Sequence, residues 1–220
     1  VFLKGLDPMI ADWAPVLWWI AAATMIVGTV VGVAQTSLKR MLAYSGIAQL
    51  GFMLLGFIPS VVAGNTVSAG NGYGSSLFYV VTYVLTTLGT FGLIMVLSRP
   101  GFESEEISDL AGLHKRSPML AGVMAVFMFS LAGIPPTVGF YAKLAVLQAL
   151  ITTNDPVLLT VSIVAVLLSL VAAFYYLRVI KVMYFDEAVI TSPINAPLDM
   201  RAVLSVNGAL LLILGIVPGA

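Results

Sequence analysis

One stretch of 35 residues decides how this chain folds: residues 118–152 read PMLAGVMAVFMFSLAGIPPTVGFYAKLAVLQALIT. The stretch is apolar almost throughout, and one straight helix of this length would measure about 52 Å, against a hydrocarbon core of roughly 30 Å. The adjacent Pro135 and Pro136 remove two backbone donors and disfavour a helix at the residue before them. The stretch is therefore either two short antiparallel membrane spans or one span that is broken in its middle.

The composition of the whole chain indicates a membrane protein. Hydrophobic residues make up 60% of the 220 positions and charged residues 9%, whereas ordinary soluble domains carry about 25% charged residues. This composition excludes a soluble globular domain, and the large apolar content excludes a disordered chain. We expect an all-α fold, a polytopic bundle of transmembrane helices that forms a single membrane domain over residues 1–220. The chain does not begin with Met and stops inside an apolar run, so we expect a fragment of a longer protein.

About six membrane spans are predicted, because a spanning helix needs roughly 20 consecutive apolar residues. The predicted spans cover residues 15–38, 41–60, 76–98, 118–152, 157–183 and 202–218. Residues 61–75 are rich in Gly, Asn and Ser and are predicted to form a loop. Residues 99–117 carry four of the ten acidic residues and are predicted to be a polar connection, as are residues 184–200.

The placement of basic residues favours a single crossing of residues 118–152. Cytoplasmic loops of membrane proteins carry an excess of Lys and Arg. With one crossing, Lys4 is alone on one side, and the other side holds Lys39, Arg40, Arg99, Lys115, Arg116, Arg178, Lys181 and Arg201. With two crossings, the last three of these residues change sides and the asymmetry is lost. We therefore predict one discontinuous helix with the basic side in the cytoplasm, where Lys39 and Arg40 serve as topology anchors.

The break in this helix is predicted near residues 133–139, and Lys143 follows it within an apolar segment. The residues expected to form the break are Gly133, Pro135, Pro136, Thr137 and Gly139. A Lys at the centre of a bilayer costs roughly 2.5–3.5 kcal/mol, so such a residue normally faces the protein interior or water. Irregular backbone at this depth needs protein or water around it, and broken helices of this kind often surround ion sites.

Lys143 is therefore a candidate proton relay, because a buried amine can exchange its proton when its surroundings disfavour the charged form. The alternatives are a side chain that reaches toward a helix end and a buried structural ion pair. Other polar residues within the spans could hold water in a hydrophilic line through the core: Ser45, Gln49, Tyr79, Tyr83 and Thr86. Their alternative is ordinary hydrogen bonding between helices, at about 0.6 kcal/mol each.

Several kinds of site have no residues to form them in this sequence. The chain has no Cys and a single His, His114, so neither thiol chemistry nor a histidine metal site is expected. No nucleotide-binding motif appears, and a net charge of zero argues against a nucleic-acid partner. We expect no cofactor and no metal in this chain.

Three stretches together resemble a known family. They are QTSLKRMLAYSGIAQLGFMLLGF at 35–57, SLAGIPPTVGFYAKLAVLQAL at 130–150 and FYYLRVIKVMYF at 174–185. The chain resembles the antiporter-like membrane subunits of respiratory complex I, the proton-pumping NADH–quinone oxidoreductase. The form AGIPPT-x-GF-x-x-K is most similar to subunit N, also called subunit 2, whereas the sister subunit M typically has Glu where Lys143 stands.

The resemblance implies the C-terminal part of an inverted-repeat fold of about fourteen helices, in which each repeat has one discontinuous helix with a Lys or Glu. Lys143 falls on that ionisable position. Relatives often have His on the second and third spans, at places that here hold Gln49 and Tyr83. Neither residue titrates near neutrality as His does, so a relay through them would need bound water.

The function implied by the resemblance is that of a non-redox subunit of a proton-translocating enzyme, which couples quinone reduction to proton pumping through Lys143. Flavin, iron–sulfur clusters and quinone would lie in other subunits. The partners would be other membrane subunits of complex I and the lipid bilayer of a bacterial plasma membrane or an inner membrane. The alternatives are a subunit of a multi-subunit sodium/proton antiporter and a structural subunit without its own proton path.

Overall fold

The computed structural model describes residues 10–58, 66–98, 105–188, 194 and 196–217, and the regular structure in these ranges is helical. The all-α prediction is confirmed. In chain order the helices are α2 Ile10–Ala34, α3 Leu38–Phe57, α5 Thr66–Leu97, the 3-10 turn η2 Ile107–Leu110, α6 Leu113–Arg116, α7 Pro118–Ala132, α8 Val138–Ile151, α9 Pro156–Phe185 and α10 Leu198–Ile216.

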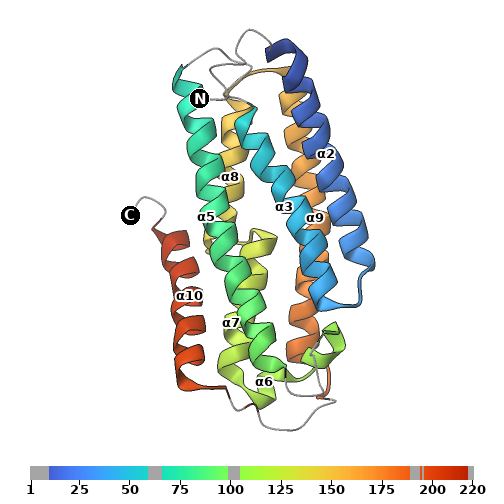
Figure 1. The fold of residues 1–220 in the computed structure, drawn as a ribbon, viewed down its shortest axis with the longest axis vertical. Coiled ribbons are helices and arrows are strands. Elements are labelled where there is room, and N and C mark those ends of the chain that lie inside the picture. Colours follow the sequence, from blue (N-terminus) through green and yellow to red (C-terminus); the bar gives the residue numbers. More distant parts are fainter. Residues whose placement is uncertain (1–9, 59–65, 99–104, 189–193, 195, 218–220) are drawn as a thin grey trace.

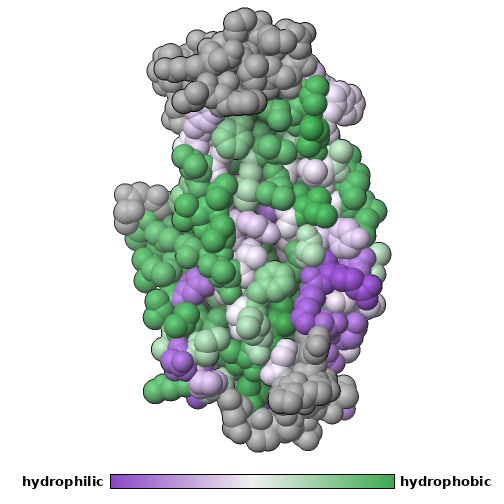
Figure 2. Space-filling model, viewed as in Figure 1, coloured by the Kyte–Doolittle hydropathy of each residue, from purple (hydrophilic) through white to green (hydrophobic). Residues whose placement is uncertain are grey.

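The outer surface of this bundle is apolar, as is usual for helices that lie within a membrane. Figure 2 shows hydrophobic residues over most of the visible face, and large side chains such as Met95 and Leu170 are more than two-thirds exposed. Within the described ranges, four helices are long and apolar enough to cross a membrane: α2, α5, α9 and α10. Helices α7 and α8 are shorter, with 15 and 14 residues, so the total of six spans stays a prediction.

Helices α7 and α8 follow one another along the bundle as the two halves of one discontinuous helix. Figure 1 shows α7 in one half of the molecule and α8 in the other, so that the pair crosses the bundle once. Their ends overlap slightly, because Gly139 at the start of α8 lies directly against the Ser130 carbonyl of α7. The structure thus confirms a single broken helix rather than two antiparallel spans.

The break has a local cause in the sequence. Helix α7 closes at Gly133, whose positive φ of 79° is accessible to glycine without strain, and its N–H donates to the carbonyls of Phe129 and Ser130. Pro135 and Pro136 follow and supply no N–H. Helix α8 begins after Thr137, which has an extended backbone and whose hydroxyl donates to the Ile134 carbonyl at 2.7 Å.

One segment differs from its prediction. Residues 61–75 were expected to be a loop, but α5 begins at Thr66, and residues 59–65 lie outside the described part of the chain. Small residues on either side of this segment contribute to helix packing. Gly56 of α3 lies against Ser76, whose hydroxyl donates to the Met53 carbonyl at 2.9 Å. Glycine and serine let membrane helices approach closely, so their abundance does not by itself indicate a loop.

Apart from Lys143, the basic residues that the structure describes gather at one end of the bundle, where α2, α5 and α9 end and α3, α7 and α10 begin (Figure 1). Here the connection from α5 to α7 is tied to the α2–α3 turn, because Leu38 N donates to the Glu105 carbonyl and Ile107 N to the Thr36 carbonyl. Lys39 pairs with Glu105 at 2.7 Å, at the first turn of α3. Lys4 and Arg99 lie outside the described residues, and the cytoplasmic placement of this end stays a prediction.

Candidate functional site

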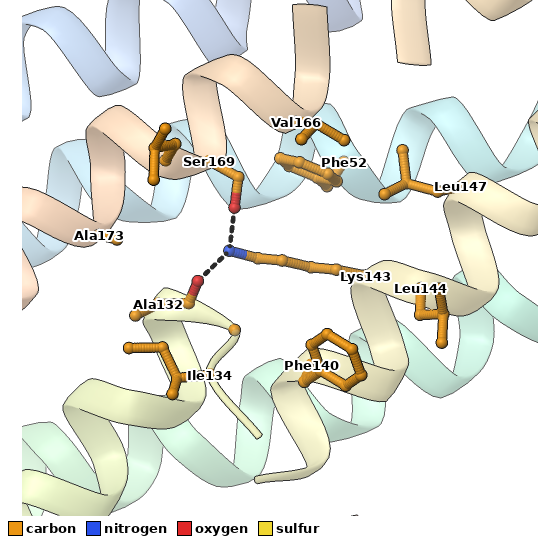
Figure 3. Close-up of a pocket in the computed structure, with 12 residues that line it drawn as sticks. Phe52, Ala132, Ile134, Phe140, Lys143, Leu144, Leu147, Val166, Ser169 and Ala173 are labelled. Atoms are coloured by element: carbon orange, nitrogen blue, oxygen red, sulfur yellow. Dashed lines mark hydrogen bonds between the residues drawn. The ribbon is translucent and has the colours of Figure 1, made fainter. Parts of the chain in front are cut away.

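Lys143 lies on α8, and its side chain points back toward the helix break, as side chains on a helix generally lean toward its N-terminus. The residue is 8% exposed. Its Nζ donates to the carbonyls of Leu131 at 3.1 Å and Ala132 at 3.0 Å, and to the Ser169 hydroxyl of α9 at 2.8 Å. Figure 3 shows the amine between Ala132 and Ser169. Three elements, α7, α8 and α9, thus meet at one nitrogen.

The break supplies the acceptors that this amine needs. The last carbonyls of a helix have no partner within it, and together they carry a partial negative charge. Because α7 ends at Ala132, the carbonyls of Leu131 and Ala132 are available to Lys143. Gly133 makes room for the lysine, since a Cβ at this position would lie 2.8 Å from Lys143 Cδ. The unwound segment is therefore a binding site for a cationic side chain.

The surroundings of Lys143 are neutral. In the part of the chain that the structure describes, no carboxylate oxygen is among its hydrogen-bond partners, which are two carbonyls and one hydroxyl. The Phe52 ring adds a weak attraction, with Nζ 5.5 Å from the ring centre. A buried ion pair, one of the alternatives for this residue, is thus not formed within the described ranges.

A polar network adjoins Lys143 on the side of α3 and α5. The Gln49 amide donates to the Leu131 carbonyl at 3.1 Å, the same carbonyl that accepts from Lys143. The amide also donates to the Tyr176 hydroxyl at 3.2 Å, and its own oxygen accepts from Tyr79. Ser45 in turn shares a hydrogen bond with Tyr176. The structure therefore brings together Ser45, Gln49 and Tyr79, which sequence analysis placed on two different spans.

Tyr83 and Thr86 line a small polar cavity beside the same amine. The cavity has a volume of about 20 Å³, and Lys143, Gln49 and Ser130 also line it. The hydroxyls of Thr86 and Ser130 lie 3.3 Å apart at its wall. One water molecule needs at least about 10–15 Å³ and two to four polar partners, so this cavity suits one water. Gln49, Tyr79, Tyr83 and Thr86 of the predicted hydrophilic line thus border the cavity beside Lys143, and Ser45 is connected to them through Tyr176. Their part in a proton path stays a prediction.

A larger cavity of about 270 Å³ lies on the other side of Lys143, between α8 and α9. Its polar side chains are Lys143 and Ser169. The remaining lining consists of apolar side chains and the backbone of the break, as Figure 3 shows for Phe52, Phe140, Leu144, Leu147 and Val166. The amine therefore stands between a small polar cavity and a larger apolar one.

Sequence analysis missed two residues of this site, Ser169 and Tyr176. They lie seven positions apart on α9 and hence on one face of it, two turns from each other. The repeat of a polar side chain at every seventh position, Ser162, Ser169 and Tyr176, is the signal that would have identified them. Nothing in the sequence, however, indicates that this face of α9 turns toward Lys143.

The remaining predicted site residues lie at the helix break and at the basic end of the bundle. Pro135 and Pro136 are within the break, Thr137 precedes α8, and Lys39 and Arg40 are in the first turn of α3. The part of the chain that the structure describes contains no cluster of three or more His, Cys, Asp or Glu side chains that could hold a metal ion.

Residues 1–169 match the family model described as NADH:quinone oxidoreductase/Mrp antiporter, transmembrane region. The chain belongs to this family. It is 54% identical to NADH-quinone oxidoreductase subunit N of Polaromonas naphthalenivorans, in an alignment that covers 100% of the chain and 44% of that relative. The chain thus spans less than half the length of the curated relatives that it matches. The resemblance to subunit N seen in the sequence is confirmed, and so is the prediction that the chain is an integral membrane protein.

Solved structures agree on the fold. A chain of respiratory complex I from Thermus thermophilus with bound aureothin is 30% identical, with a TM-score of 0.79, and the match covers 93% of this chain and 44% of that one. A chain of the Mrp complex from Dietzia sp. DQ12-45-1b is 20% identical, with a TM-score of 0.75 and the same two coverages. The second likeness shows the fold alone. Because chains of both assemblies have this fold, the fold alone does not distinguish a complex I subunit from an antiporter subunit. Sequence identity has to make that distinction.

Proposed function

We propose that this chain is part of a proton-translocating membrane-arm subunit of NADH-quinone oxidoreductase, of the kind called subunit N. The observation that carries the proposal is the position of Lys143: a buried amine at a helix break, held by neutral oxygens, between two cavities. An amine in an ion pair would leave a buried, unpaired carboxylate whenever it lost its proton, at a cost of several kcal/mol. An amine held by carbonyls and a hydroxyl leaves no such charge, so it can alternate between its two protonation states.

The energy for this alternation would come from other subunits. Flavin, iron–sulfur clusters and quinone would bind there, and their redox reactions would reach Lys143 as a change in charge or hydration along the membrane arm. Two unit charges 4 Å apart interact by about 4 kcal/mol at an effective dielectric constant of 20. A nearby charge change of this size is enough to decide whether the amine is charged or neutral.

The test uses the full-length parent protein in its native membranes. In the Lys143→Ala variant, we expect an assembled complex that still reduces quinone with NADH but takes up fewer protons per quinone into inverted vesicles. Lys181→Ala is the matched control, because it removes a more exposed Lys that pairs with Asp186 near the end of α9. Unchanged proton uptake in Lys143→Ala would refute the relay and leave a structural subunit.

The second candidate is a subunit of a multi-subunit sodium/proton antiporter, since the family and the fold include such proteins. The 54% identity to a subunit N favours the oxidoreductase. The same membranes separate the two: the antiporter requires sodium-dependent proton movement without NADH. If the purified parent protein carried no NADH–quinone reductase subunits with it, the antiporter would replace the present proposal.

A further inference from the structure

We infer that Ser169 is a second relay residue, which takes the proton from Lys143 and passes it into the cavity between α8 and α9. This inference rests on the proposed function and deepens it, because it assigns the residue through which the proton leaves. It stands on three observations: the chemistry of the three groups that contact the amine, the acceptor shared with Gln49, and the position of the larger cavity.

The three oxygens around Lys143 Nζ differ in what they can do with a proton. A backbone carbonyl accepts a hydrogen bond but has no proton of its own to release, whereas a hydroxyl accepts one proton while it donates another. The carbonyls of Leu131 and Ala132 can therefore hold the ammonium but cannot transmit its proton. Ser169, at 2.8 Å, can do both.

The network on the other side of the amine is interrupted for direct proton transfer. Lys143 and Gln49 are connected through the Leu131 carbonyl, and each of them donates to it. A carbonyl that accepts from two N–H groups cannot pass a proton from one to the other. A proton can arrive on this side through a water in the small cavity beside Thr86 and Ser130, but it cannot follow the hydrogen bonds from Gln49 to Lys143.

The larger cavity is the space into which Ser169 would pass the proton. Its volume of about 270 Å³ has room for several waters, each of which occupies about 30 Å³ in the liquid. Two of its lining residues, Val166 and Leu170, are 49% and 71% exposed, so the cavity reaches the surface of the described helices. Apolar cavities tend to stay dry, and apolar constrictions can gate by losing their water. The proton would then leave only while water fills the cavity.

The transfer step balances without any other reactant than water. An Nζ–H bond of the Lys143 ammonium breaks and its proton bonds to Ser169 Oγ. The original hydroxyl proton of Ser169 moves to a water in the cavity, which becomes hydronium. Lys143 is left as the neutral amine and Ser169 as a neutral hydroxyl, which must rotate before the next cycle.

The test compares three serine variants in the assembled complex, with the two assays described for Lys143. Ser169→Ala should still reduce quinone and should lose the same share of proton uptake as Lys143→Ala. Ser169→Thr should restore the uptake, because it keeps a hydroxyl at the same position. Ser162→Ala is the control: this buried serine is on the same helix, and its hydroxyl donates to the Leu158 carbonyl of its own helix. It should pump normally.

Each result decides the matter. Normal uptake in Ser169→Ala, with loss in Lys143→Ala, would overturn this inference and leave the proposed function intact. Normal uptake in Lys143→Ala would overturn both. If proton uptake in Ser169→Thr were as low as in Ser169→Ala, the hydroxyl would not be responsible for uptake, and the inference would be overturned. Should Ser169→Ala disturb assembly, Ser169→Cys keeps the volume with a weak donor, and it should pump less than the parent; unchanged pumping would overturn the inference.

Discussion

At the scale of single residues, the site depends on how one amine is accommodated at a helix end. The carbonyls that α7 leaves unpaired at Leu131 and Ala132 are the acceptors for Lys143, and Gly133 leaves the space that its side chain fills. The same residues that end the helix therefore also build the site. A change at the break should act on stability and on the amine together.

Gly133→Ala tests this double role. Its φ of 79° is unfavourable for a residue with a Cβ by roughly 1–2 kcal/mol, and the new methyl group would press on Lys143. We expect a lower denaturation midpoint of the purified protein together with weaker proton uptake. Gly122→Ala is the control within α7, because nothing lies within 4 Å of a Cβ there and Ala favours a helix over Gly by about 1 kcal/mol. Equal midpoints for the two variants would contradict the expectation.

At the scale of helices, the site depends on close approach between α3 and α5. Helix α3 carries Ser45, Gln49 and Phe52, and α5 carries Tyr79 and Thr86. The two helices meet where Gly56 lies against Ser76, and a second close contact joins Gly46 to the Tyr83 hydroxyl. Small residues on α3 thus set the distance across which the polar side chains hydrogen-bond.

Gly56→Val should separate these helices near one end. A larger side chain in a packed interface costs typically 1–3 kcal/mol, and here it would collide with Ser76, which donates to the Met53 carbonyl. We expect a lower midpoint of thermal denaturation in detergent. In Gly74→Ala, on α5, an added methyl group meets nothing within 4 Å, so that variant should denature at the parent temperature or above. Unaltered stability of Gly56→Val would show that α3 and α5 can adjust.

At the scale of the whole molecule, α9 connects the site to the basic end. It carries Ser169 and Tyr176 in the site, and further along it carries Arg178, whose guanidinium donates to the carbonyls of Val33 at 3.2 Å and Gln35 at 2.5 Å. These carbonyls lie at the end of α2 and in the turn that follows it. Arg178 therefore fixes the position of α9 relative to α2. It thereby also fixes where Ser169 lies along the bundle axis relative to Lys143.

Arg178→Met should destabilise the bundle by roughly 1.5–3 kcal/mol, the usual range for hydrogen bonds to a charged group. Arg178→Lys should recover only part of this loss, since an ammonium cannot span two carbonyls as the planar guanidinium does. For comparison, Lys181→Met removes an exposed ion pair with Asp186, worth at most about 1 kcal/mol. Urea or thermal denaturation of the three variants measures the difference, and a midpoint for Arg178→Met equal to that of Lys181→Met would contradict the assignment.

The sequence by itself determined the fold class, the break and the unusual lysine. Two prolines beside Gly133 interrupt a helix wherever it lies, and a charge within an apolar stretch is recognisable without coordinates. It also suggested the polar residues of α3 and α5, because residues four apart share a face of a helix. These signals are local, since each depends on residue types at fixed spacing.

The tertiary structure alone decided which groups contact Lys143. In a soluble helix a polar stripe shows which face is exposed, but the lipid-facing side of a membrane helix is as apolar as the core. The sequence of α9 therefore does not indicate that Ser169 and Tyr176 face inward while Leu170 faces outward. Residues 61–75 were predicted to form a loop from their content of small residues, whereas α5 begins at Thr66. Whether glycine and serine break a helix or let two helices meet depends on what packs against them.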